Sequence, residues 1–190
     1  MELGLRGQVA IVSGGSKGIG CEIAAQLAEE GVSVLLAARG AEALEAAVKE
    51  IKSAGGAALG SVAEMKVHAD VRRAVATAEQ AFGPVDIAIS NVYPRNTKGL
   101  DNTADDDLAR EFNDIVMSVV HLARAVIPQM KKRRWGRLIN IGASTMKGPV
   151  LDFPPYCRTF PARRSSGSTA HSQTNSANTR SQLTTSPLAR

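Results

Sequence analysis

Short apolar runs alternate with longer amphipathic segments between Val9 and Ile141. Apolar runs of this kind, bounded by glycine or polar residues, are typical of strands that are buried on both faces of a sheet. We expect five such strands, at residues 9–13, 33–38, 65–69, 86–90 and 137–141.

Helical periodicity fills the intervals between these strands. Apolar residues recur three and four positions apart at Ile23, Ala24, Leu27 and Ala28, as on one face of a helix. We expect helices at residues 19–30, 41–54, 72–82 and 105–130, the first three ended by Gly31, Gly55-Gly56 and Gly83-Pro84. Strands separated by helices predict an α/β fold, a doubly wound parallel sheet with a ligand site at the carboxyl ends of its strands.

The composition changes after Pro155. Of the 34 residues from Cys157 to Arg190, 13 are serine or threonine, none is acidic and eight are hydrophobic. These apolar side chains are too few to form a core. We therefore expect residues 1–155 to form one domain and residues 156–190 to form a disordered tail.

The charge follows the same division. The formal net charge is +5, and the first 156 residues sum to zero, so the excess of basic residues belongs to the last 34. The domain itself therefore has no net positive charge, which argues against a nucleic-acid partner.

Other function classes are also excluded on sequence grounds. No apolar run reaches the roughly 18 residues of a membrane span, and the N-terminus lacks the features of a signal peptide. Cys21 and Cys157 match no metal spacing, and the three histidines are scattered along the sequence. We expect a cytoplasmic protein with reduced thiols, no membrane partner and no metal site.

A glycine-rich turn, Ser13-Gly14-Gly15-Ser16-Lys17-Gly18-Ile19-Gly20, follows the first expected strand and opens the first helix. In this context glycines allow a sharp turn, a close approach of a ligand and tight packing of helix on strand. The free N–H groups of the helix can then bind a pyrophosphate. The turn therefore predicts a dinucleotide-binding, Rossmann-like domain.

The spacing Gly-x-x-x-Gly-x-Gly resembles that of the short-chain dehydrogenase/reductase family, and the resemblance extends from about Leu5 to Pro149. It includes Ala69-Asp70-Val71, Ser90-Asn91 and residues 136–141, in the family's order. The resemblance implies a nicotinamide cofactor, with Asp70 against the adenine amine and Asn91 along the cofactor. Asp70 could instead cap the helix that follows it.

The residues after the second strand favour NADP over NAD. A site for NAD usually has an acidic residue there, whereas a 2′-phosphate needs a cation, and this chain has Ala38-Arg39. Lys17 could add a second cation. The cofactor-binding candidates are Ser13, Gly14, Ser16, Lys17, Gly18, Ile19, Gly20, Arg39, Asp70 and Asn91.

The family's catalytic residues are only partly matched. Ala143 stands where the family has its serine, and Ser144 would serve only with a local shift. Tyr156 is placed for the catalytic tyrosine, but position 160 is Phe160 where the family has lysine. Without that cation a tyrosine keeps a pKa near ~10 and transfers protons poorly at neutral pH.

The long helix also departs from the family pattern. Counting back from Leu122 places Ile115 where the family has asparagine, and Asn113 is expected on the surface.

The family usually continues through a helix with the catalytic pair and two more strands, so the expected sheet is incomplete at its C-terminal edge. Ser165, Ser168, Ser172 and Ser176 are spaced as one face of a helix. Serine codons read in another frame encode apolar residues, which suggests a frameshift near Pro155. The alternative is a natural disordered tail. We expect a homo-oligomer only if the C-terminal helix is restored.

These observations lead to three hypotheses. The first is an NADP-dependent oxidoreductase acting on a carbonyl or secondary alcohol, resembling 3-oxoacyl-acyl-carrier-protein reductases and impaired in this chain. The others are a non-catalytic NADP-binding module and a non-functional product of a disrupted gene.

Overall fold

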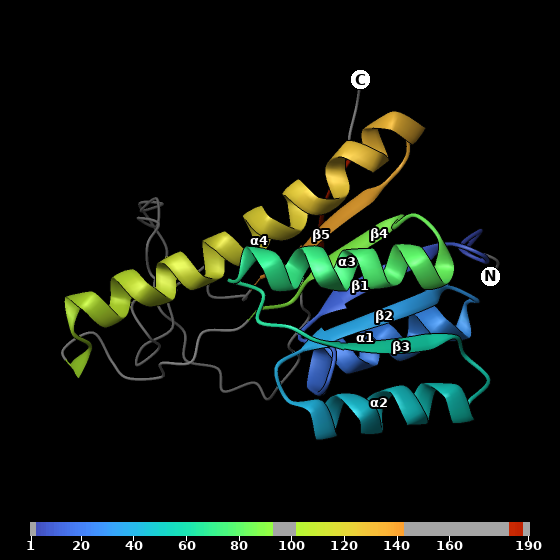
Figure 1. Ribbon diagram of the computed structural model, residues 1–190, viewed down its shortest axis with the longest axis horizontal. Helices are drawn as coiled ribbons and strands as arrows, with labels where there is room; N and C mark the ends of the chain where they lie inside the picture. Colours follow the sequence, from blue (N-terminus) through green and yellow to red (C-terminus); the bar gives the residue numbers. More distant parts are fainter. Residues whose placement is uncertain (1–2, 93–101, 143–182, 188–190) are drawn as a thin grey trace, which may run out of the picture.

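The computed structural model describes residues 3–92, 102–142 and 183–187. Strands and helices alternate along the first two ranges (Figure 1). The strands are β1 (Val9–Ser13), β2 (Ser33–Ala38), β3 (Ala58–Val62), β4 (Ile87–Ser90), β5 (Arg137–Ile141) and β6 (Leu183–Pro187). The helices are α1 (Gly18–Glu29), α2 (Ala41–Ser53), α3 (His68–Phe82) and α4 (Asp105–Arg133).

The strands form one sheet in the order β3-β2-β1-β4-β5-β6. The first five are parallel, with Val9 of β1 opposite Ser33 of β2 and Ile87 of β4 opposite Arg137 of β5. The chain thus proceeds outward from β1 on one side and then returns to the other side with β4. This arrangement confirms the expected doubly wound, Rossmann-like fold.

Helices cover both faces of the sheet, and the alternating side chains of β1 explain why. Val9 and Ile11 pack in one core cluster with residues of α3 and α4, whereas Ala10 and Val12 pack in the other with residues of α1 and α2. A strand buried on both faces needs apolar residues at every position, and β1 and β2 have them almost throughout. Figure 1 shows α3 and α4 in front of the sheet.

The expected third strand was wrong. Residues 58–62 form β3, and residues 65–69 form a turn and the start of α3. In the edge strand β3 only Ala58 and Ser61 are buried, and Gly60 lies where a Cβ would be 3.0 Å from Leu44 Cγ. A strand that is half exposed and contains glycine and serine lacks the continuous apolar run that marked its neighbours.

Residues 183–187, within the segment expected to be a disordered tail, form β6 antiparallel to β5. Disorder was inferred from the small number of apolar residues, but an edge strand is joined by backbone hydrogen bonds. The β-branched Thr184 and Thr185 favour the extended backbone, and Pro187 is tolerated on an edge strand. The other residues of the expected tail lie outside the described ranges.

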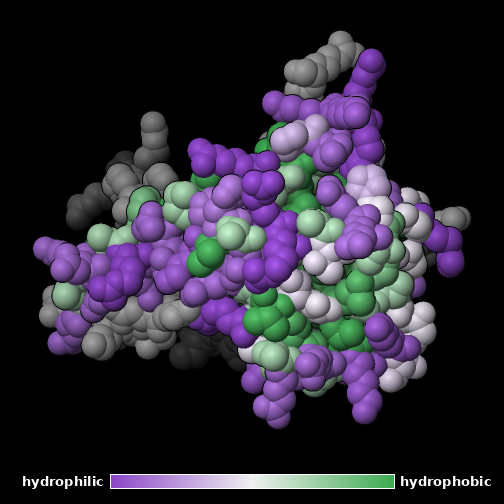
Figure 2. Space-filling model, viewed as in Figure 1, coloured by the Kyte–Doolittle hydropathy of each residue, from purple (hydrophilic) through white to green (hydrophobic). Residues whose placement is uncertain are grey.

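The long helix α4 extends beyond the sheet at its N-terminal end (Figure 1). Hydrophilic residues predominate over this half of the helix (Figure 2), and its first turn contains Asp105, Asp106 and Asp107. Negative charge at a helix N-terminus is favourable because it complements the helix dipole. Within the described ranges, no helix combines the length and the apolar character needed to cross a membrane.

Candidate functional site

The carboxyl ends of β1 to β4 open onto a cavity of about 600 Å³. Its lining comes from the loops after these four strands and from one face of α4. The lining residues are Gly14, Ser16, Lys17, Ala37, Ala38, Arg39, Gly40, Ala63, Glu64, Met65, Lys66, Asn91, Val92, Glu111, Asp114, Ile115 and Ser118. This is the position at which doubly wound sheets bind their ligands.

The glycine turn after β1 forms one wall of the cavity, and glycine is needed at different positions of the turn for different structural reasons. Gly14 has φ of +64°, and a Cβ there would clash with the backbone oxygen of Asn91. Gly20 is buried, and its Cβ would clash with the backbone oxygen of Gly14. Gly18 has φ of +55° with open space around its Cβ position. The turn therefore packs tightly on β4 and stays open at Gly18.

Helix α1 starts within this turn. Its N-cap residue, Lys17, makes no side-chain hydrogen bond to the first turn of the helix. The N–H groups at the start of a helix have no partner within the helix, and together with the dipole they favour a bound anion. The arrangement fits a phosphate or pyrophosphate beside Gly18.

Ser13 and Asn91 join the ends of the two central strands. The backbone N–H of Asn91 donates to Ser13 Oγ at 2.9 Å, and the Asn91 side-chain amide donates to the carbonyl oxygen of Gly14 at 3.4 Å. Ser13 is fully buried. Asn91 lines the cavity, and the buried Ser13 accepts the hydrogen bond from its backbone. The structure therefore brings the two predicted residues together.

The predicted cations also stand at the cavity. Lys17 in the glycine turn and Arg39 directly after β2 are both exposed and both contribute to the lining. Of the remaining predicted residues, Ser16 lines the cavity, whereas Gly18, Ile19 and Gly20 form the first turn of α1 and are not among the lining residues.

Asp70 does not line the cavity. It lies in the first turn of α3, where its carboxylate accepts the backbone N–H of Glu64 at 2.9 Å and pairs with Arg73 at 2.9 Å. The hydrogen bond from Glu64, assisted by Arg73, lowers the pKa of Asp70. The residues that follow the observed third strand and reach the cavity are Ala63, Glu64 and Met65. Recognition of residues 58–62 as a strand would have pointed to them.

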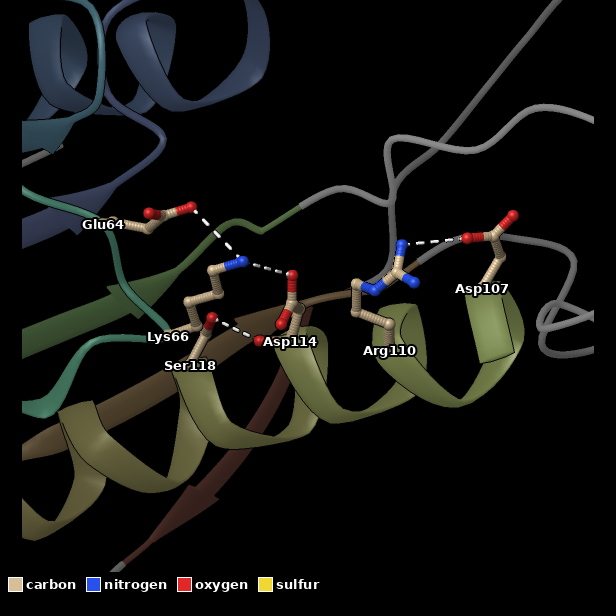
Figure 3. Close-up of polar contacts among 6 residues, drawn as sticks. All are labelled: Glu64, Lys66, Asp107, Arg110, Asp114 and Ser118. Atoms are coloured by element: carbon tan, nitrogen blue, oxygen red, sulfur yellow. Dashed lines mark hydrogen bonds and ion pairs between the residues drawn. The ribbon is translucent and has the colours of Figure 1, made fainter. Parts of the chain in front are cut away.

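The wall opposite the glycine turn contains charged residues that the sequence reasoning missed. Lys66 Nζ lies 2.9 Å from Asp114 Oδ2 and 3.6 Å from Glu64 Oε1 (Figure 3). The hydrogen bond to Asp114 raises the pKa of Lys66. Ser118 Oγ donates to the backbone oxygen of Asp114 at 2.6 Å, one turn along α4.

The signal for this wall was present in the sequence. The cavity-lining residues of α4 are Glu111, Asp114, Ile115 and Ser118, which follow the spacing of a single helix face. A polar group at three of these four positions marks a helix face that is turned toward a ligand or solvent rather than toward the core. Ile115 lines the cavity. Asn113 is exposed, as the sequence predicts.

Two of the histidines are not scattered in space. The ring centroids of His68, at the start of α3, and His121, in α4, lie 5.2 Å apart with an interplanar angle of 51°. His121 is buried, and its Nδ1 has no hydrogen-bond partner among the described residues. Ser144 and Tyr156, the candidates for catalysis, lie outside the described residues, as does Tyr93.

The sequence and the structure were compared with known proteins. The sequence profile of the family described as short chain dehydrogenase matches residues 8–162. The 3-oxoacyl-acyl-carrier-protein reductase of Pseudomonas aeruginosa is 32% identical over 141 residues, which are 74% of this chain and 57% of that protein.

Two solved structures share the fold. L-sorbose reductase from Gluconobacter frateurii, complexed with NADPH and L-sorbose, superposes with a TM-score of 0.77 and 29% identity over 83% of this chain and 60% of that one. An NAD⁺-bound xylitol dehydrogenase gives a TM-score of 0.75 and 27% identity over 81% of this chain and 60% of that one. The chain thus spans about three fifths of the length of these relatives.

Proposed function

Because this chain belongs to the short-chain dehydrogenase family, we propose that it is an NADP(H)-dependent oxidoreductase acting on a carbonyl or secondary alcohol. The observation that carries the proposal is the cavity at the strand ends, with the open glycine turn on one wall and Lys17 and Arg39 beside it. When bound, the nicotinamide cofactor supplies or accepts the hydride.

The glycine turn supports the dinucleotide part of the proposal. The start of α1 has no side-chain cap, and Gly18 leaves open space where any other residue would have a Cβ. Both features suit a pyrophosphate that must approach the backbone closely. Asn91, which follows β4, continues the cavity wall formed by the glycine turn.

Lys17 and Arg39 support the choice of NADP over NAD. Arg39 occupies the position after β2 that contacts the adenosine ribose in dinucleotide folds, and an arginine there suits a 2′-phosphate. A carboxylate at this position would instead accept the ribose hydroxyls of NAD. The two solved relatives hold NADPH and NAD⁺ respectively, so the residues of this chain carry the argument.

The catalytic residues of this chain match the family pattern less well than its cofactor-binding residues do. Ser144 and Tyr156 are proposed to hold the substrate oxygen and to transfer its proton. Position 160 has Phe160 in place of a lysine, so the cation that would assist proton transfer is missing from this position. We therefore propose slow turnover. The same substitution favours a second candidate function, a non-catalytic NADP-binding protein.

Direct binding tests the proposal on the full chain. Titration calorimetry with NADPH and NADH is expected to show tighter binding of NADPH. Arg39→Asp should weaken NADPH binding by about 10- to 100-fold, because a charge-assisted contact is lost and repulsion is added. Arg72→Asp, at an exposed position of α3 outside the cavity lining, is the matched control and should leave both affinities unchanged.

The results also separate the two candidate functions. Oxidation of bound NADPH by a panel of ketones and aldehydes supports the oxidoreductase, whereas tight binding without turnover supports the binding protein. Equal affinity for NADH and NADPH would refute the cofactor assignment, and a chain that binds neither would refute both functions.

A further inference from the structure

The edge of the sheet at β3 and the outer face of α2 form a groove of about 480 Å³. Figure 1 shows α2 beside β3 at this edge. Among the described strands, β3 stands at the end of the sheet and pairs with β2 alone. Its sequence, Ala-Leu-Gly-Ser-Val, contains neither the charged residues nor the proline that commonly protect an edge strand from pairing with another chain. This edge can therefore accept a further strand.

The backbone of β3 directs alternate hydrogen-bonding groups away from β2. The carbonyl oxygen of Ala57 and the N–H of Ala63 bond to β2. Because the direction alternates along a strand, the groups of every second residue between them point outward instead. These residues are Ala58, Gly60 and Val62. The side chain of Arg73 donates to the carbonyl oxygen of Val62 at 2.9 Å, which agrees with this direction.

Strand β3 and helix α2 have a common midpoint. A Cβ added at Gly60, the middle residue of β3, would lie 3.0 Å from Leu44 Cγ and 3.4 Å from Val48 Cγ2. Val48 lies near the middle of α2, and both it and Gly60 line the groove. Val62, which also lines the groove, is 50% exposed. A two-fold axis through this edge can therefore relate both elements to their copies at once.

The charged side chains of α2 that line the groove are separated by sign along the helix. Glu45 precedes Val48, whereas Lys49 and Lys52 follow it. All three are exposed, and within the described ranges none of them takes part in an ion pair. A two-fold axis near Val48 would place Glu45 of one copy opposite Lys52 of the other, and the same pair would recur on the far side of the axis.

We propose that this groove is the contact surface of a homodimer, in which the β3 strands of two copies pair antiparallel about Gly60. Gly60 would then face its own copy, and Ala58 would face Val62 of the second copy, so all the paired residues are those with outward backbone groups. Helix α2 contacts both β2 and β3. With strands about 4.8 Å apart, the two α2 helices would lie two strand spacings apart, about 10 Å, which is a normal helix packing distance.

Charge complementarity between the two α2 helices is the reason to expect a second copy of the chain here. Each copy supplies the acid that the other lacks, and Lys49, which lies nearest the axis, can reach Glu45 of either copy. The groove lies at the opposite edge of the sheet from β5 and β6, so the dimer does not depend on the segments that follow β5. It shares no lining residue with the cofactor cavity and is independent of the proposed function.

Sedimentation of the full chain over a range of concentrations tests the proposal, and a reversible monomer–dimer equilibrium is expected. Glu45→Lys and Lys52→Glu should each weaken dimerisation by about 10- to 30-fold, because each change reverses two symmetry-related contacts. The double variant Glu45→Lys/Lys52→Glu should return the dissociation constant toward the wild-type value, since the facing charges are merely exchanged. Damage to the fold by either single change would not be repaired in this way.

Glu50→Lys is the matched control, because it makes the same charge change at an exposed position of α2 outside the groove lining, and it should keep the wild-type dissociation constant. Val62→Lys tests β3 separately from α2 and should weaken dimerisation, since a lysine on an edge strand opposes pairing. A wild-type chain that stays monomeric, as it would if the groove took a peptide or another protein, overturns the proposal. A dimer whose dissociation constant these groove variants leave unchanged overturns it as well.

Discussion

The backbone N–H of Asn91 donates to Ser13 Oγ at 2.9 Å, joining the end of β4 to the end of β1. This contact holds the backbone of Asn91 against the glycine turn, and the turn has glycine where a larger residue would clash. At Gly14 and at Gly20 an added Cβ would meet Asn91 or the adjoining backbone. The glycines therefore serve the packing of the strand ends as well as any ligand.

Gly14→Ala tests this relationship. The change should destabilise the fold by about 3 kcal/mol or more, because it adds a clash with Asn91 to the cost of a positive φ, which is about 1–2 kcal/mol. Gly4 has nearly the same backbone angle, +66° against +64°, with no atom within 4 Å of its Cβ position. Gly4→Ala should therefore cost only the conformational part. Urea unfolding of both variants measures the difference, and equal losses would mean that the clash relaxes freely.

Asp86 makes a corresponding link at the opposite ends of the strands. Its Oδ2 accepts the N–H of Val9 at 3.0 Å, and its Oδ1 lies 3.1 Å from Arg133, which also donates to the carbonyl oxygen of Val85 at 2.8 Å. Asp86→Ala should cost about 2–4 kcal/mol, because it leaves the Val9 amide without its acceptor and a largely buried guanidinium without its counter-charge.

The comparison for this prediction is Asp107→Ala, which breaks the exposed pair with Arg110. Exposed pairs contribute little, so a loss below about 1 kcal/mol is expected in chemical denaturation. Similar losses for the two variants would contradict the role assigned to Asp86.

The central half of the fold was predictable because its signals are local. Residues 9–13 and 33–38 are apolar at nearly every position, and the predicted bounds of these two strands agree with β1 and β2. The glycine turn was recognised for the same reason, since one continuous segment contains every residue that shapes it. The edge strand β3 was not predicted because only two of its five residues are buried and Gly60 interrupts the apolar pattern.

The far wall of the cavity was not predictable in the same way. Lys66 and Asp114 are 48 positions apart, and they meet only because α4 returns past the loop after β3. Asp70 was expected directly after the third strand, and the structure has it in the first turn of α3, because the strand itself lies earlier in the sequence. Once β3 is placed at residues 58–62, Glu64 and Lys66 follow it directly.

The acid stability of the chain should depend on Asp70. Its pKa is lowered from the ordinary value of 3.8, first by the hydrogen bond from the Glu64 amide and then by Arg73. A carboxyl whose folded-state pKa is depressed stabilises the fold fully above the unfolded-state value, and this contribution disappears as the pH falls through the folded-state pKa.

Asp70→Asn should therefore reduce the urea midpoint at pH 7, and the difference from the wild type should shrink as the pH falls below 3.8. Denaturation curves at pH 7, 4 and 3 measure this convergence. Glu50→Gln, which alters an exposed acid of α2 outside its first turn, should leave the difference between pH 7 and pH 3 close to that of the wild type. A gap between Asp70→Asn and the wild type that stays constant with pH would contradict the assignment.

His121 offers a change that should increase stability. Its ring is buried against His68, and within the part of the chain that the structure describes its Nδ1 makes no hydrogen bond. A buried polar atom without a partner costs about 1–3 kcal/mol. Phenylalanine has a ring of similar size without that nitrogen, so His121→Phe is expected to raise the free energy of unfolding by about 1 kcal/mol. His68→Phe, at an exposed position of the same pair, should have little effect. Thermal and urea unfolding at pH 7 compare the two variants. A loss of stability in His121→Phe would show that the nitrogen has a partner whose removal outweighs the gain.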